Sequence, residues 1–376
     1  MKNLRRIAAE LPIDVVSCIL SHLPVKSVLR FKCVSKSWYS LISDPHFKRL
    51  HLLHSHKSAN LVLVLKMHIR KVLSEQLHLL YYYGFCDATF FDDIISGDSS
   101  QIELPFRRPL HLCDGMILCS CDGLLLTRNQ YNNFGHLTLW NPSTRERREL
   151  PPLQCDYPSK SAALGYDSST DDYKVLFVPL NGNRLKDVMI LSLKTNCWRE
   201  VKDFKCYRLE NGVSLNGSLA FLQHSVVRYL SAKIVCFSLA NESTTEMEHP
   251  RNCHNYGRLN LGVLQGCLCL TETAFSNCSM MTVWLMKEFG VTSSWTKLIT
   301  IPNMSRYPTL ISSILLPLDH MNETVFLIHN NFGFSSYILI INNFEAEDYR
   351  FVKIAELQED ELLTGLAYIR TLTSPN

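Results

Sequence analysis

Five segments with the same pattern, a short apolar strand, a polar turn and a second strand, recur along the chain at nearly constant spacing. They are 137–150, 188–201, 234–247, 282–298 and 338–354. Their third residues lie 51, 46, 48 and 56 positions apart, at Leu139, Ile190, Cys236, Trp284 and Ile340. Four-stranded propeller blades recur about every 40–50 residues, and short β-rich segments bounded by turns fit blades far better than paired helices of the same period. The repeat therefore predicts an all-β propeller.

Further short strands lie between these segments, as a four-stranded blade requires. They are expected within 121–127, 162–178, 212–222 and 261–272. Turn-forming pairs separate apolar runs at Asp122-Gly123, Asn216-Gly217 and Gln265-Gly266, and such pairs are typical of two-residue β-hairpins. Residues two apart on a strand share a face, so core positions are predicted for the pairs Cys119/Cys121 and Cys267/Cys269.

The first fifty residues have a helical pattern. Glu10-Leu11-Pro12 opens the first helix, because proline is tolerated in a first turn and Asp14 interacts favourably with the positive end of the helix dipole. An apolar stripe follows at Val15, Val16, Ile19, Leu20 and Leu23. Pro24 ends this helix, and a second helix carries Val25, Val28, Leu29 and Cys33. A third begins with Trp38, Leu41 and Ile42 and ends near Asp44-Pro45.

Three such helices cannot bury this much apolar surface among themselves, because domains of about 40 residues are marginal without a metal, a disulfide or a partner. The stripe must be covered by another protein or by the C-terminal body of this chain. Residues 1–50 carry nine Lys/Arg and three Asp/Glu, a net charge of +6, whereas the whole chain has a net charge of +3. This imbalance favours an acidic partner for the N-terminal module, and a solvated basic face is the alternative.

Residues 11–42 read LPIDVVSCILSHLPVKSVLRFKCVSKSWYSLI, which resembles the F-box of plant proteins. The resemblance implies that this module binds a Skp-type adaptor and, through it, a cullin and a RING subunit. It further implies that twelve residues form the fold of the F-box and its contact with the adaptor. They are Leu11, Pro12, Val15, Ile19, Leu20, Leu23, Pro24, Val25, Leu29, Cys33, Val34 and Trp38. The sequence alone does not divide them between these two roles.

The rest of the chain, roughly residues 50–370, resembles the F-box-associated, kelch-related propeller of plant F-box proteins. The phrases that carry this resemblance include CDGLL, LWNPSTRE, LGYDSSTDDYKV, CWREV and VWLMKEFGVTSSWTKL. LNGSLAFL lacks the His-Trp pair usual after its turn, and the glycine pairs of true kelch repeats are absent, so the number of blades stays open. The expected architecture is multidomain, with an all-α F-box of three helices (1–48), a linker with the first propeller strands (49–105) and a kelch-like β-propeller (106–370).

The sequence has none of the motifs HExxH, GxSxG, GxxxxGK[ST] or GxGxxG. His51, His54 and His56 suggest a metal site, but no carboxylate or cysteine completes the ligand set. A phosphate site or, more simply, a solvated hairpin would account for Arg145, Arg147 and Arg148. Packing between blades, rather than stacking on a ligand, is expected for Trp140, Trp198, Trp284 and Trp295. We expect no catalytic residue, no metal and no cofactor.

The sequence favours a cytoplasmic or nuclear protein, or one present in both compartments. Glu10, Pro12 and Asp14 interrupt the place of a signal-peptide apolar core, and no run of about 18 apolar residues could span a membrane. The 14 cysteines include no CxxC pair, which favours reduced, buried thiols. We expect no nucleic-acid partner and no membrane partner.

These features predict a non-catalytic receptor, the substrate-recognition subunit of an SCF-type (Skp–cullin–F-box) ubiquitin ligase. The F-box would bind the adaptor, and the propeller would hold a protein substrate near the charged ubiquitin carrier for ubiquitination and proteasomal degradation. One alternative is an F-box protein that uses the adaptor outside a ligase. Another, from the enzyme class, is a propeller hydrolase or lyase. The sequence assigns neither the substrate nor the residues that bind it.

Overall fold

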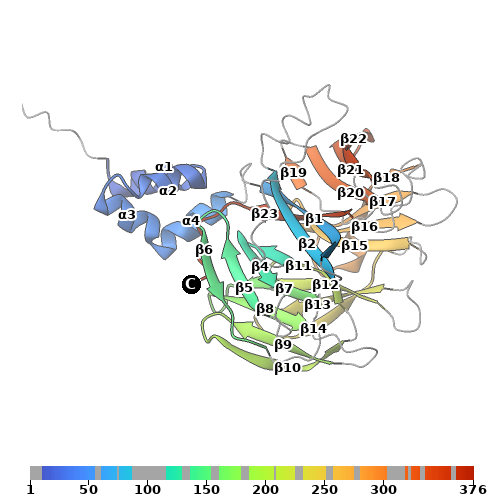
Figure 1. The fold of residues 1–376 in the computed structure, drawn as a ribbon, viewed down its shortest axis with the longest axis horizontal. Helices are drawn as coiled ribbons and strands as arrows, with labels where there is room; N and C mark the ends of the chain where they lie inside the picture. The colour runs from blue at the N-terminus through green and yellow to red at the C-terminus, as the bar shows by residue number, and fades with distance from the viewer. Residues whose placement is uncertain are drawn as a thin grey trace, which may run out of the picture.

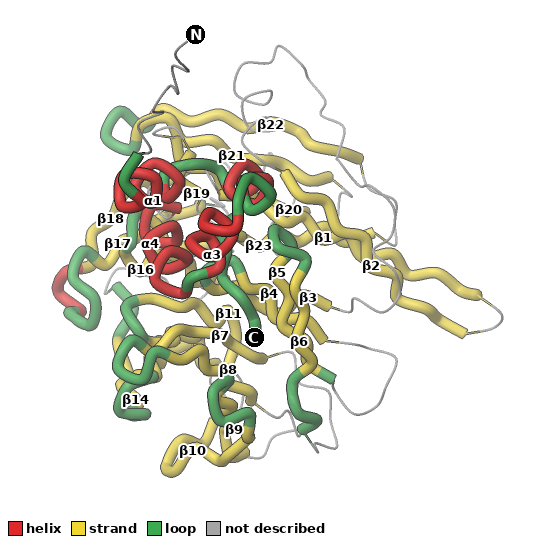
Figure 2. The backbone as a smooth tube through the Cα atoms, turned by 90° about the vertical axis from the view of Figure 1, so that its left-hand side faces the viewer, coloured by secondary structure: helices red, strands yellow, loops and turns green. Residues whose placement is uncertain are grey.

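The computed structural model describes residues 11–55, 61–73, 76–86, 116–128, 136–153, 161–178, 186–206, 209–224, 232–250, 257–274, 280–302, 318–320, 323–330, 335–356 and 361–376. Four N-terminal helices lie to one side of a set of β-sheets (Figure 1). Seen from that side, the helices lie over one face of the sheets (Figure 2). The predicted architecture, an all-α module followed by an all-β propeller, is confirmed.

The helical module consists of α1 (Ile13–Ser21), α2 (Val25–Phe31), α3 (Lys36–Ser43) and α4 (Pro45–Ser55). Pro12 and Pro24 precede α1 and α2, and their carbonyls accept the first backbone hydrogen bonds of each helix. Ser35 caps α3, because its Oγ accepts a hydrogen bond from the backbone N–H of Trp38 at 3.2 Å. No helix in the described part of the chain is long and apolar enough to cross a membrane.

Helix α4 corrects the prediction of three helices. The pair Asp44-Pro45 ends the third helix, as predicted, but it also starts a fourth. Asp44 Oδ1 accepts hydrogen bonds from the backbone N–H groups of His46 and Phe47, at 2.8 and 3.2 Å. Pro45 occupies the first position of α4, where a missing N–H is harmless. One dipeptide therefore ends one helix and caps the next.

Five four-stranded antiparallel sheets, with their strands in sequence order, make up most of the described β-structure. The first contains β3 (Met116–Cys121), β4 (Leu124–Arg128), β5 (Leu137–Asn141) and β6 (Glu146–Glu149). The second contains β7 (Ser161–Asp167), β8 (Asp172–Val178), β9 (Lys186–Ser192) and β10 (Cys197–Cys206). The third contains β11 (Leu209–Leu215), β12 (Ser218–His224), β13 (Ala232–Ser238) and β14 (Thr244–Met247).

The fourth sheet contains β15 (Gly257–Leu264), β16 (Cys267–Ala274), β17 (Met281–Met286) and β18 (Trp295–Ile301), and a short 3-10 helix, η1 (Thr292–Ser294), precedes β18. The fifth contains β19 (Leu318–His320), β20 (Glu323–Asn330), β21 (Ser335–Asn343) and β22 (Asp348–Glu356). The five recurring segments of the sequence are the third and fourth strands of these sheets. The interpretation of the repeat as propeller blades is thus confirmed.

A sixth sheet joins the two ends of the propeller sequence. It has the order β2-β1-β23 and contains β1 (Leu61–Leu73), β2 (Gln76–Cys86) and β23 (Glu361–Ile369). The antiparallel register of β1 and β23 runs from Leu61 opposite Ile369 to Ile69 opposite Glu361. β23 lies next to β3 of the first sheet and β20 of the fifth. Strands from both ends of the propeller sequence therefore close the ring.

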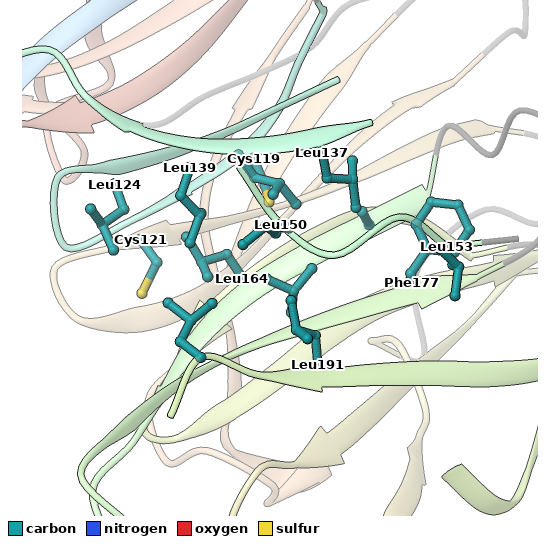
Figure 3. Packing of buried hydrophobic residues seen from close by; sticks show 14 residues of the cluster. Cys119, Cys121, Leu124, Leu137, Leu139, Leu150, Leu153, Leu164, Phe177 and Leu191 are labelled. Carbon is teal, nitrogen blue, oxygen red and sulfur yellow. The ribbon is translucent and has the colours of Figure 1, made fainter. Parts of the chain in front are cut away.

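The cores lie between neighbouring sheets. Figure 3 shows one of them, in which Leu124 and Leu139 of the first sheet meet Leu164 and Leu191 of the second. Cys119 and Cys121 belong to this core, as their spacing predicted. Each of the three predicted hairpin turns has positive φ at both residues, for example 49° and 82° at Asp122 and Gly123. This is the backbone that asparagine or aspartate followed by glycine favours.

Three of the four tryptophans of the repeats pack in or beside the cores between sheets, as predicted, whereas Trp140 is half-buried outside the described cores. Trp284 lies in the core between the third and fourth sheets, and Trp198 and Trp295 pack at the edges of cores. The indole N–H of Trp198 donates to the carbonyl of Pro151 at 2.8 Å, and that of Trp295 donates to the carbonyl of Glu248 at 3.2 Å. The first bond joins β10 to the segment after β6, and the second joins β18 to the segment after β14. Each bond thus connects two neighbouring sheets.

Candidate functional site

Large apolar side chains that face solvent are concentrated in the helical module. Eight such residues are exposed in the described part of the chain, and seven of them lie between residues 11 and 53. Those seven are Leu11, Ile13, Val15, Ile19, Val34, Tyr39 and Leu53. Exposed apolar surface at this density is typical of a surface that binds another protein.

Helix α1 carries two apolar stripes with opposite environments. Val15 and Ile19, four residues apart and on one face, are 42% and 50% exposed. Val16 and Leu20, one position further along, are only 7% and 2% exposed. The broad stripe seen in the sequence is therefore divided: one half packs inside the module, and the other half is available to a partner.

The module has a core of its own, although a small one. Its buried members come from all four helices and from the C-terminal end of the chain, and they are Val16, Leu20, Val25, Val28, Ile42, Phe47 and Leu372. Leu23, Leu29, Phe31, Trp38 and Leu41 pack around them as partly buried residues. Phe31 and Trp38 meet edge to face, with ring centroids 5.5 Å apart, which joins α2 to α3.

Histidines of α4 join that helix to α1. His51 is buried, with Nε2 2.9 Å from the carbonyl oxygen of Leu23 and Nδ1 3.1 Å from Ser55 Oγ. His54 Nδ1 lies 3.0 Å from Ser21 Oγ, and its ring stacks on His22 with centroids 3.8 Å apart. His51 and His54 thus have structural roles in α4, and His56 lies outside the described residues. Within the described residues, no group of three His, Cys, Asp or Glu could hold a metal ion.

The comparison with known families identifies both parts of the chain. Residues 9–50 match the F-box domain, and residues 89–374 match the F-box associated beta propeller domain. The chain belongs to the F-box proteins with an F-box associated beta propeller. It is 30% identical over 329 residues to the F-box protein CPR1 of Arabidopsis thaliana, which covers 78% of this chain and 73% of that protein. It is 28% identical over 390 residues to an F-box/kelch-repeat protein of the same plant, with 97% and 96% covered.

The structure divides the twelve residues predicted for the F-box fold and its adaptor contact. Leu20 and Val25 are buried in the F-box core, so they belong to the fold and are not available for contact. Leu23, Leu29 and Trp38 are partly buried against that core. The others are exposed and remain candidates for the adaptor contact: Leu11, Pro12, Val15, Ile19, Pro24, Cys33 and Val34.

Two exposed F-box residues escaped the sequence interpretation. Ile13 is 48% exposed at the start of α1, and Tyr39 is 59% exposed on α3, with the Lys32 ammonium 5.8 Å from the centre of its ring. Tyr39 directly follows Trp38, and adjacent helical residues point in different directions. The half-buried position of Trp38 could therefore have indicated that Tyr39 faces solvent.

The arginines of the β5–β6 hairpin serve the propeller itself. Arg148 lies neither in a solvated hairpin nor at a phosphate site, because its guanidinium donates to the carbonyls of Leu193 and Pro375 at 2.7 and 3.1 Å. It also donates to Asn196 Oδ1 at 2.9 Å. The Arg147 guanidinium lies over the ring of Trp140 at 5.1 Å. Arg148 therefore links the first sheet to the second and to the C-terminal end of the chain.

The F-box should become less stable as the pH falls below the ordinary histidine pKa of 6.5. Burial lowers the pKa of His51, the hydrogen bond with the Leu23 carbonyl raises it, and the charge of His54 lowers it further, with a net decrease. The folded F-box then binds fewer protons than the unfolded one, so stability is lost on acidification. Hydrogen exchange of α1 and α4, corrected for intrinsic rates, should show less protection at pH 5.5 than at pH 7.5. If wild type and His51→Gln had the same protection as each other at pH 5.5 and at pH 7.5, the loss of stability could not be assigned to His51.

Proposed function

We propose that this chain is the substrate-recognition subunit of an SCF-type ubiquitin ligase. The observation that carries the proposal is the F-box surface: an apolar stripe on α1 that lies one position away from the core stripe and faces solvent. If the F-box only packed on the propeller, these side chains would be buried against the propeller, since exposed apolar side chains at this density are unfavourable without a partner. The F-box therefore binds a Skp-type adaptor, which brings the cullin and the RING subunit.

The chain contributes binding and not covalent chemistry in this proposal. F-box proteins with a propeller generally act as receptor or adaptor subunits. The propeller holds a protein substrate while the adaptor fixes the F-box to the ligase, so that a lysine of the substrate meets the charged ubiquitin carrier at a high effective concentration. The net charge of +6 over residues 1–50 speeds the encounter with an acidic adaptor surface.

Deletion of residues 1–55 should abolish capture of the adaptor and cullin while leaving the propeller folded, because the first propeller strand begins at Leu61. We expect the tagged full chain, expressed in plant cells, to capture a Skp-type adaptor, a cullin and a RING subunit. The shortened chain should capture none of these, yet both forms should capture the same substrate. Mass spectrometry with and without a proteasome inhibitor measures this, and the substrate should accumulate when the inhibitor is present.

The same experiment separates the alternatives. Capture of the adaptor without a cullin would support a role outside a ligase and contradict the proposal. Capture of the adaptor by the shortened chain would show that the F-box surface is not the contact. A propeller hydrolase or lyase would keep its turnover in the shortened chain, and no protein would depend on residues 1–55 for its degradation.

A further inference from the structure

The last residues of the chain lie between the propeller and the F-box. After β23 ends at Ile369, residues 370–376 continue beside the helices, and the C-terminus lies close to β6 (Figures 1 and 2). Thr371, Leu372 and Thr373 are 0%, 1% and 9% exposed. Segments outside helices and strands usually run over the surface, so the burial of these three successive residues requires a structural reason.

The backbone of this segment is fixed to the first sheet of the propeller. Asn141 is fully buried at the end of β5, and its Nδ2 donates to the carbonyls of Thr371 and Thr373, at 3.2 and 2.7 Å. Thr371 Oγ1 donates to the carbonyl of Asp122 at 2.7 Å. Gly123 makes room for this contact: a methyl group there would overlap the Thr371 side chain and come within 2.7 Å of the Ile369 carbonyl.

More bonds hold the segment at both of its ends. At the start, the Tyr368 hydroxyl donates to Asn141 Oδ1 at 3.1 Å and lies 2.6 Å from Ser143 Oγ. Near its end, Arg148 donates to the carbonyl of Pro375 at 3.1 Å. The backbone of residues 370–376 is therefore part of the propeller.

The Leu372 side chain, by contrast, belongs to the F-box. It packs in the same core as Val16, Leu20, Val28 and Phe47. A module of about 45 residues has little apolar surface to bury, so one added leucine is a large fraction of its core. Arg49 on α4 also contacts the propeller: its guanidinium lies 5.2 Å from the centre of the Tyr166 ring and forms an ion pair with Asp171 in the β7–β8 turn. That pair is 51% and 62% exposed, and exposed ion pairs contribute little to stability.

We propose that residues 370–376 form a strap, which completes the F-box core with Leu372 and holds the F-box in one orientation on the propeller. The chain enters the propeller at Leu61 and leaves it at Ile369, and these two residues lie opposite each other in the β1–β23 pair. The F-box is thus attached at one point of the ring by two chain segments. One consequence rests on the proposed function: the strap fixes the adaptor surface relative to the bound substrate, as ubiquitin transfer requires.

Hydrogen exchange of the full chain without adaptor tests the strap, so its result does not depend on the proposed ligase role. In Leu372→Ala, the amides of α1, α2 and α3 should exchange at least about tenfold faster, since truncation of a buried leucine removes packing contacts and leaves a cavity. Exchange in β15–β18 should stay as in wild type. Thr371→Val, which removes the bond to Asp122, should change α1–α3 in the same direction by a smaller factor.

Leu239→Ala is the matched control, because Leu239 is equally buried but lies in the core between the second and third sheets. It should speed exchange in those sheets and leave the helices unchanged. Unchanged helices in Leu372→Ala, or equal acceleration of helices and all sheets in both variants, would overturn the strap. If Leu372→Ala yields no folded protein, Leu372→Val provides a smaller truncation. Its hydrogen exchange in the helices and in the sheets is then compared with that of Leu239→Ala. Failure to bind a purified Skp-type adaptor, with the exchange result intact, would count against the proposed function alone.

Discussion

Replacing Val15 and Ile19 with glutamate should abolish adaptor binding and leave the F-box folded. Both side chains lie on the exposed stripe of α1, so no core contact is lost. Glutamate is a better helix former than valine or isoleucine, so α1 keeps its stability. A central interface residue is worth about 2 kcal/mol or more, and two such losses weaken binding about a thousandfold or more at 1.4 kcal/mol per tenfold. Isothermal titration calorimetry with a purified Skp-type adaptor measures the loss, and circular dichroism measures the helices.

The neighbouring pair Val16 and Leu20 supplies the control. These residues have the same spacing on the same helix but lie in the core, so Val16→Glu with Leu20→Glu should unfold the F-box. Both double variants should lose adaptor binding. Only the Val16/Leu20 variant should also lose the helical circular-dichroism signal and the hydrogen-exchange protection of α1–α3. Binding of the Val15/Ile19 variant within a few-fold of wild type would show that another surface of the F-box makes the contact.

The sequence could predict the propeller because its signals are local and repeated. Each strand pair such as β5–β6 or β9–β10 needs only a short apolar run, a polar turn and a second run, and all of these lie within about 20 residues. The turns at Asp122-Gly123 and Asn216-Gly217 depend on two adjacent residues alone. The core positions of Cys119 and Cys121 follow from the two-residue period of a strand.

The features that escaped prediction join distant parts of the chain. Pairing of Leu61 with Ile369 closes the ring, and no local pattern in either strand indicates its partner. The role of Arg148 depends on the backbone carbonyls of Leu193 and Pro375. Every residue has such a carbonyl, so only the fold determines which of them lie near Arg148. Likewise, the division of α1 into core and exposed stripes depends on α4 and on Leu372 from the other end of the chain. The sequence therefore predicts the exposed apolar face of the F-box as a region and not residue by residue.

A buried ion pair lies within the second sheet, and its lysine also bonds to the third sheet. Lys174 on β8 and Asp167 at the end of β7 have side chains only 9% and 1% exposed, and Lys174 Nζ lies 2.8 Å from Asp167 Oδ2. The ammonium also donates to the carbonyl of Leu239 at 2.7 Å, in the turn that follows β13. Ser169 and Thr170 donate hydroxyl hydrogen bonds to the carboxylate. Both oxygens of the Asp167 side chain thus have hydroxyl partners, and Lys174 supplies the counter-charge.

Lys174→Met should destabilise the propeller by about 3–5 kcal/mol at pH 7, because it leaves the Asp167 carboxylate buried without its counter-charge. Burial alone raises the pKa of Asp167, but the bonds from Lys174, Ser169 and Thr170 outweigh it and hold the pKa well below the ordinary 3.8. In wild type, this pair therefore stabilises the fold above pH 3.8, and its contribution is lost as the pH falls further. Without Lys174 the carboxyl protonates more readily, so the difference in unfolding free energy between variant and wild type should shrink from pH 7 to pH 4. Urea unfolding followed by tryptophan fluorescence measures this difference.

Lys233→Met is the control, because its pair with Glu246 is exposed, and its urea midpoint should match wild type. A difference for Lys174→Met that is small at pH 7, or constant down to pH 4, would show that the Lys174–Asp167 pair does not stabilise the propeller in this way.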